Sequence, residues 1–213
     1  MSTVREMQVA VTHGAEAIGV VSAMPSGPGP IADELAAEIV RQTPVPVATW
    51  LLTSRTTADA VAEQVELVGC NHVQLVDTID DGPALRRMLP KSLKIVQVIH
   101  VRDTSAIGEA NAAAEWADAI LLDSGDPTAD IKQLGGTART HDWAISRRIV
   151  DSTHLEHRKP VFLAGGLTSD NIREAIETVR PFGVDVCSGV RSNGELDSIR
   201  LERFIDAVRG KRA

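Results

Sequence analysis

The chain has 213 residues, 43% of them hydrophobic and 24% charged, so it can bury the core of one large domain or two small ones. Its net charge of −7 and its 3% of aromatic residues argue against a nucleic-acid or anionic-membrane partner. No apolar run approaches the roughly 18 residues of a membrane span, and the N-terminal segment lacks a signal-peptide core. Two cysteines far apart in sequence favour a reducing cytoplasm.

Short apolar runs alternate with amphipathic helical patterns along the whole chain. Thr3 and Glu6 have the spacing of a capping box, which predicts a first helix over Met7–His13. Strands are predicted at 17–21, 46–52, 72–76, 94–101, 119–123, 160–165 and 183–189. Further helices are predicted at 32–42, 57–69, 106–117, 169–180 and 197–210. This alternation indicates a parallel sheet covered by helices, and no linker divides the single domain, 1–213.

Two α/β architectures fit seven strand-helix units, an open doubly wound sheet and a TIM (β/α)8-type barrel. No G-x-G-x-x-G follows the first strand, as a dinucleotide-binding sheet would usually have. Glycines and polar residues instead gather late in the chain, in "GGTART" at 135–140, "AGGL" at 164–167 and "SGV" at 188–190. Because barrels bind phosphate in the loops after their last two strands, these glycines favour the barrel.

The stretch Val161–Ile176, "VFLAGGLTSDNIREAI", carries two glycines between a strand and a helix. Glycine lets a ligand approach the backbone, and the first turn of a helix offers free N–H groups to an anion. A tight turn that needs an unusual backbone angle is the alternative explanation.

The order of "LLD", "GGTARTHDW", "PVFLAGGLTSDNIREAI" and "GVDVCSGVRSNGELD" resembles the phosphoribosylanthranilate isomerases of tryptophan biosynthesis. The resemblance implies a cytoplasmic barrel enzyme that uses no metal or organic cofactor. Its reaction is an Amadori rearrangement, which converts a phosphoribosyl-amine, a small phosphorylated sugar substrate, into a 1-deoxyribulose.

The resemblance also implies the site residues. Backbone amides hold the substrate phosphate in the family, and the matching residues are Gly135, Gly136, Thr137, Gly165, Gly166, Ser188 and Gly189. The general acid of the family matches Asp123, whose position after four apolar residues would raise its pKa. A turn-forming aspartate is the alternative, because "DSGDP" is also typical of a turn.

The chain departs from the family pattern in several places. The first strand and its cysteine base are absent from these residues, and three explanations are open: a true start upstream of Met1, a protein that does without a first strand, or a decayed copy. For a barrel without that strand we expect either an unusual closure or a homodimer that covers the gap. Segment 22–30, "SAMPSGPGP", lacks the arginine that binds the anthranilate carboxylate in the family. Val76 replaces a histidine. Arg191 replaces a glutamate beside the phosphate loop, where it either strengthens anion binding or is a solvated loop residue.

Two residues are candidates for the missing base. His100 ends a strand next to Asp123, although a structural histidine is the alternative. Cys187 would lie near the absent first strand with a thiol pKa lowered by Arg191, although buried cysteines are usually small apolar residues. His141 is a further candidate to face the site. His154 and His157 are expected on a solvated surface, with no metal.

Three hypotheses therefore remain open. The first is an isomerase of phosphoribosylanthranilate or a close phosphoribosyl-amine. The second is a related barrel enzyme for a different sugar phosphate, with His100 or Cys187 as its base. The third is a non-catalytic phosphate-ligand binder.

Overall fold

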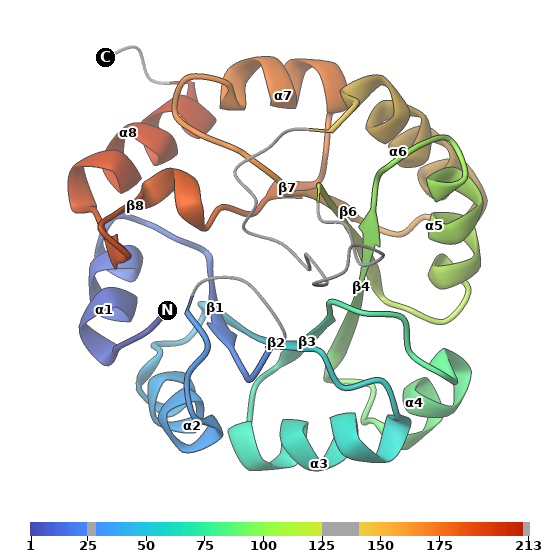
Figure 1. The fold of residues 1–213 in the computed structure, drawn as a ribbon, viewed down its shortest axis with the longest axis horizontal. Coiled ribbons are helices and arrows are strands. Elements are labelled where there is room, and N and C mark those ends of the chain that lie inside the picture. The colour runs from blue at the N-terminus through green and yellow to red at the C-terminus, as the bar shows by residue number, and fades with distance from the viewer. Residues whose placement is uncertain (25–28, 125–140, 211–213) are drawn as a thin grey trace.

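The computed structural model describes residues 1–24, 29–124 and 141–210, and it shows strands surrounded by helices (Figure 1). Seven parallel strands form one sheet in sequence order. They are β1 (Ala17–Val21), β2 (Ala48–Thr53), β3 (His72–Leu75), β4 (Lys94–His100), β5 (Ala119–Asp123), β6 (Val161–Leu163) and β7 (Gly183–Val184). The sheet curls around the centre of the molecule, as the prediction of a barrel-type α/β fold requires.

Eight helices of the described residues form the outer layer. They are α1 (Val4–Thr12), α2 (Asp33–Gln42), α3 (Ala58–Val68), α4 (Gly82–Met88), α5 (Ala106–Ala114), α6 (Trp143–His157), α7 (Ile172–Val179) and α8 (Ser198–Arg209). A short 3₁₀ turn, η1 (Ser188–Val190), and a hairpin of β8 (Arg191–Ser192) and β9 (Glu195–Leu196) follow β7. No helix in the described ranges has the length and apolar character to cross a membrane.

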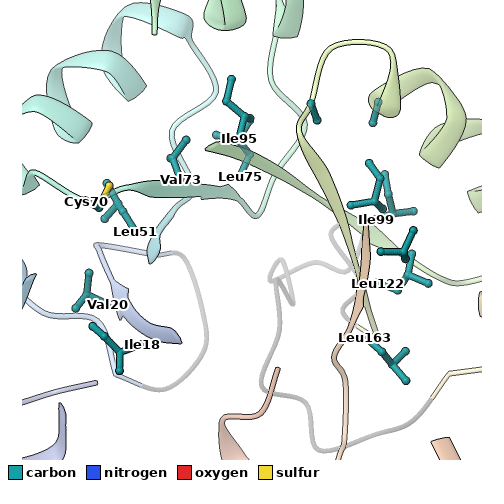
Figure 2. Packing of buried hydrophobic residues seen from close by; sticks show 14 of the residues in the cluster. Ile18, Val20, Leu51, Cys70, Val73, Leu75, Ile95, Ile99, Leu122 and Leu163 are labelled. Atoms are coloured by element: carbon teal, nitrogen blue, oxygen red, sulfur yellow. The ribbon is translucent and has the colours of Figure 1, made fainter. Parts of the chain in front are cut away.

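The two faces of each strand have different neighbours. Side chains such as Ile18, Leu51 and Leu163 point outward and pack against the helices in the larger buried cluster (Figure 2). Alternate residues point inward, where Trp50 packs in a second cluster with Val98 and Leu121. Since both faces are buried, the strands are almost continuously apolar.

The first helix, which the sequence predicted at Met7–His13, spans Val4–Thr12 and closes the ring of helices. In the described part of the chain, β1 and β7 each pair with one strand, and α1 lies between α8 and α2 (Figure 1). Met7 and Ala10 of α1 are buried in the core. The ring of helices is thus closed, while the sheet keeps β1 and β7 as outer strands in the described residues.

An ion pair fixes α1 to the β8–β9 hairpin. Arg191 donates from Nη1 to Glu6 Oε1 at 3.0 Å and from Nη2 to Oε2 at 2.8 Å. Leu196 N–H donates to the same carboxylate at 3.0 Å. Thr3 Oγ1 accepts from Glu6 N–H, as the capping box requires, but the Glu6 side chain bonds the N–H of Ser2.

The sequence misplaced some elements. It missed α4, a short helix that begins at Gly82 and Pro83 with Asp81 as its N-cap. It also missed α6, whose last turns include His154 and His157. The two late strands are shorter than predicted, since they end at Leu163 and Val184.

Candidate active site

Four positions form a row at the C-terminal ends of neighbouring strands. They are His100, Asp123, Ala164 and Asp185. His100 pairs with Asp123 in the sheet register. One residue earlier, Leu122 pairs with Leu163, and Leu163 pairs with Val184. The register therefore places Ala164 and Asp185 level with Asp123. All four face the inside of the sheet because side chains alternate along a strand and Leu122 and Leu163 face the helices.

Asp123 is buried at the end of β5, with 7% of its surface exposed. Desolvation raises the pKa of its carboxyl, while the Ser124 N–H bond and the charge of His100 oppose that rise. Oδ1 accepts the Ser124 N–H at 2.8 Å. A carboxyl in these surroundings holds its proton more readily than a solvated aspartate does, which is the property of a proton donor.

His100 is oriented by a backbone carbonyl. Its Nε2 lies 3.0 Å from Val76 O, and a carbonyl only accepts, so Nε2 carries the hydrogen. Nδ1 is buried and has no partner among the described residues. His100 therefore has a structural bond on one nitrogen and an open acceptor on the other.

A cavity of about 720 Å³ opens beside His100, between the ends of β3 and β4. The register of these strands ends at Leu75 and Gln97, and β4 continues beyond it. Gln97 Nε2 lies 3.3 Å from both Leu75 O and Asp77 O, and its Oε1 has no partner in the described chain. The cavity also reaches Arg102, Glu109 and Trp116.

The two glycines after β6 adopt backbone angles that other residues avoid, with φ of +85° at Gly165 and +63° at Gly166. A Cβ on Gly165 would lie 2.8 Å from Ser124 N and 3.0 Å from Asp123 Oδ1. The turn and the close approach to the acid both require glycine here. Tight-turn geometry and ligand access are therefore compatible at this position.

The loop after β7 packs directly on the loop after β6. A Cβ on Gly189 would lie only 2.0 Å from Leu167 O. Within the residues that the structure describes, the N–H groups of Gly165, Gly166, Ser188 and Gly189 have no hydrogen-bond acceptor. Adjacent N–H groups of this kind can bind an anion. The matching Gly135, Gly136 and Thr137 lie outside the described residues.

The other predicted site residues have different surroundings. Burial and the Asp185 charge raise the pKa of Cys187, against the lowering by Arg191, so the expected low thiol pKa was wrong. Arg191 is paired with Glu6 instead of standing as a free or solvated arginine. His141 Nε2 lies 2.6 Å from Ser146 Oγ of α6, and burial lowers the His141 pKa to about 4.

The sequence reading missed Asp185. It lies two residues before Cys187, and the alternation of "GVDVC" puts both on the inward face with Gly183. Burial, followed by the charge of Asp123, raises the Asp185 pKa to about 6, although the amino group of Met1 opposes the rise. The described residues hold no group of three His, Cys, Asp or Glu side chains that could bind a metal ion.

Comparison with known proteins places this geometry in a family. The sequence profile of the N-(5'phosphoribosyl)anthranilate (PRA) isomerase family matches residues 2–207. N-(5'-phosphoribosyl)anthranilate isomerase 2 of Methanosarcina mazei is 36% identical over 206 residues, which are 95% of this chain and 88% of that protein. The isomerase of Halobacterium salinarum is 35% identical over 96% of this chain and 91% of its own length.

Solved structures agree with these sequence matches. Phosphoribosyl anthranilate isomerase from Thermotoga maritima superposes with a TM-score of 0.79 at 26% identity, covering 99% of this chain and 96% of that chain. Another isomerase structure, in complex with reduced 1-(o-carboxyphenylamino)-1-deoxyribulose 5-phosphate, has a TM-score of 0.76 at 25% identity and covers 99% and 95%. The chain belongs to the N-(5'-phosphoribosyl)anthranilate isomerase family.

Proposed function

We propose that this chain is an isomerase of tryptophan biosynthesis that converts N-(5'-phosphoribosyl)anthranilate into its 1-deoxyribulose isomer. The observation that carries the proposal is the location of Asp123 and the glycine loops at one end of the sheet. A Cβ on Gly165 would touch Asp123, and Gly189 packs on the same loop at Leu167. One small sugar phosphate can therefore reach both the acid and the free N–H groups.

The phosphate end of the substrate would be held by the loops after β6 and β7. Gly165, Gly166, Ser188 and Gly189 offer main-chain N–H groups without an internal acceptor in the described chain. Such groups stabilise a phosphoryl group without a basic side chain. Arg191 is left out of this proposed site because its guanidinium is bonded to Glu6 and to Gly194 O.

The reacting end of the sugar would lie against Asp123. Ring opening of a phosphoribosyl-amine requires a proton on the ring oxygen, and a carboxyl with a raised pKa can provide it. The nitrogen lone pair then forms a C=N bond as the bond from C1 to the ring oxygen breaks. Asp123 is accordingly the proposed general acid.

A different sugar phosphate is the second candidate substrate, and the end of β1 favours it. Ser22 Oγ donates to Asp33 Oδ1 at 2.8 Å, and Gln64 Nε2 donates to both carboxylate oxygens at 3.0 Å. Arg55 is 3.7 Å from Asp33 and is thus already paired. An acidic group near this strand end is unfavourable for a substrate carboxylate.

Turnover of N-(5'-phosphoribosyl)anthranilate by the purified chain tests the first candidate. We expect product formation, complementation of a tryptophan auxotroph that lacks the isomerase, and a large loss of kcat in Asp123→Asn. Asp59→Asn is the control, because it removes an exposed carboxylate from α3. Turnover of another sugar phosphate alone would support the second candidate, and phosphate binding without any turnover would support a non-catalytic binder.

We further propose that the protein acts in the cytoplasm and forms a homodimer. The support for a dimer is the pair of outer strands, since β1 and β7 each have one partner in the described sheet. Sedimentation equilibrium measures the mass directly. A mass of one chain at micromolar concentration would contradict the dimer.

A further inference from the structure

The isomerisation needs a proton acceptor as well as a proton donor. After ring opening, the proton on C2 of the sugar must leave before the carbonyl can move to that carbon. His100 Nε2 donates to Val76 O and its Nδ1 is buried, so a substrate carbon does not reach its open nitrogen, and the surroundings of Cys187 keep its thiol protonated. The remaining inward-facing group in the described row is Asp185.

Asp185 lies level with Asp123, two strands away on the inner face of the sheet. The register places Ala164 of the β6 edge level with both, and the next residue is Gly165, so no large side chain separates the two carboxyls. Neighbouring strands are ~4.8 Å apart, which puts the two backbones roughly 10 Å from each other. A pentose fits in that interval with one carboxyl on either side of its first two carbons.

The surroundings of Asp185 differ from those of Asp123. Asp185 is more exposed than Asp123, which is only 7% exposed, so water and substrate reach it even though neighbouring protein atoms desolvate its carboxyl. The groups around its carboxyl are Asp123, Cys187, the Met1 amino group and the Val186 N–H. Two carboxyls that repel each other favour a state in which only one is charged, and that is the state a reaction with one acid and one base requires.

We infer that Asp185 is the catalytic base of this chain and takes the C2 proton of the ring-opened substrate. The inference rests on the proposed isomerase function.

The steps balance without an oxidant or a reductant. Asp123 gives its proton to the ring oxygen, and the C1–O bond breaks as the nitrogen lone pair forms C=N. The Asp185 carboxylate takes the C2 proton, the C–H electron pair forms C1=C2, and the C=N electrons return to nitrogen. The enol hydroxyl then gives its proton to Asp123 while Asp185 returns its proton to C1. The product is the ketose, and both carboxyls regain their starting states.

Asp185→Asn is the first test, with N-(5'-phosphoribosyl)anthranilate as the substrate. We expect kcat to fall by about 10²–10⁴-fold, as for loss of a general base, with a much smaller change in KM. The wild-type kcat/KM should fall as the pH drops below about 6, where Asp185 takes up a proton, and the residual activity of the variant should lack that limb. Asp59→Asn is the control, because it removes the same charge from an exposed position on α3.

Asp185→Gly with added formate separates a catalytic role from a structural one. A small carboxylate can enter the space left by the side chain, so we expect formate to restore part of kcat in a concentration-dependent way. Circular dichroism melting of each variant shows whether it is folded. A folded Asp185→Asn variant with near-normal kcat, or a Gly variant without any rescue, would overturn the inference.

The outcomes also separate this inference from the proposed function. A wild-type chain that does not turn over the substrate contradicts the proposed function, and the assignment of Asp185 fails with it. An active wild type whose Asp185 variants keep their rate refutes the assignment alone. Loss of the same size in Cys187→Ser, with activity kept in Asp185→Asn, would move the base to the thiol.

Discussion

The ion pair between Glu6 and Arg191 is predicted to hold α1 in place, and Glu6→Gln should test this. Both side chains are 13% exposed, and the two guanidinium nitrogens bond the two carboxylate oxygens. Burial opposes ionisation of Glu6, but hydrogen bonds from Arg191, Ser2 and Leu196 hold its pKa down from 4.5 to about 2. The carboxylate is therefore more favourable in the folded state than in the unfolded chain.

The size of the effect follows from linkage. A fall in pKa from 4.5 to about 2 corresponds to about 3.4 kcal/mol, at about 1.36 kcal/mol for each pKa unit. Solvent screening at the edge of the molecule lowers this contribution, so we expect about 2 kcal/mol for the variant at pH 7. Because the folded pKa is lowered, the contribution is complete above the unfolded pKa and is lost as the pH falls from about 5 toward 2.

Urea unfolding of wild type and Glu6→Gln, at pH 7 and at pH 3, measures the difference in free energy of unfolding. The difference should be about 2 kcal/mol at pH 7 and clearly smaller at pH 3. Glu202→Gln on the exposed face of α8 is the control and should change the free energy by less than about 0.5 kcal/mol. A Glu6→Gln effect that equals the control, or that does not depend on pH, would refute the reasoning.

Three further predictions concern single positions. Gly189→Ala should raise KM for the phosphorylated substrate and lower the melting temperature, because its Cβ would lie 2.0 Å from Leu167 O; unchanged steady-state kinetics would contradict this. Gly82→Ala should destabilise the fold by about 1–3 kcal/mol in urea unfolding, since its Cβ would lie 2.3 Å from the Trp116 ring, and a neutral result would contradict the packing. His141 has a pKa lowered to about 4, so its contribution to stability should fall as the pH drops from about 6.5 to 4. His141→Gln should remove that pH dependence from the unfolding curve, and an unchanged curve would refute it.

The positions of most strands were predictable because they depend on local patterns. The apolar run at 119–123 ends in Asp123, and the structure has β5 with these bounds. Likewise β1 covers the predicted 17–21. A strand buried on both faces is apolar over its whole length, and that signal is present in any short window of the sequence. The helix α4 has no such signal, since Gly82 and Pro83 are typical of a turn as well as of a first helical turn.

The site was predictable only in part. Asp123 and His100 could be found because each ends an apolar run, and the adjacent runs predicted adjacent strands. Asp185 was missed because the chain after Val184 alternates like a longer strand, and an aspartate there has no local feature that sets it apart. The ion pair of Arg191 could not be predicted because its partner is 185 residues away.

The sequence by itself determined the strand-helix alternation, the parallel sheet and the late glycines, because periodicity, propensity and backbone freedom are properties of neighbouring residues. Only the tertiary structure decided that α1 closes the ring through Glu6 and that Asp185 lies level with Asp123. Both arrangements depend on the curl of the sheet. The curl brings the two outer strands, and with them residues from opposite ends of the chain, close together. Charges and desolvation act between such residues through space, so their pKa values and their chemistry depend on the assembled fold.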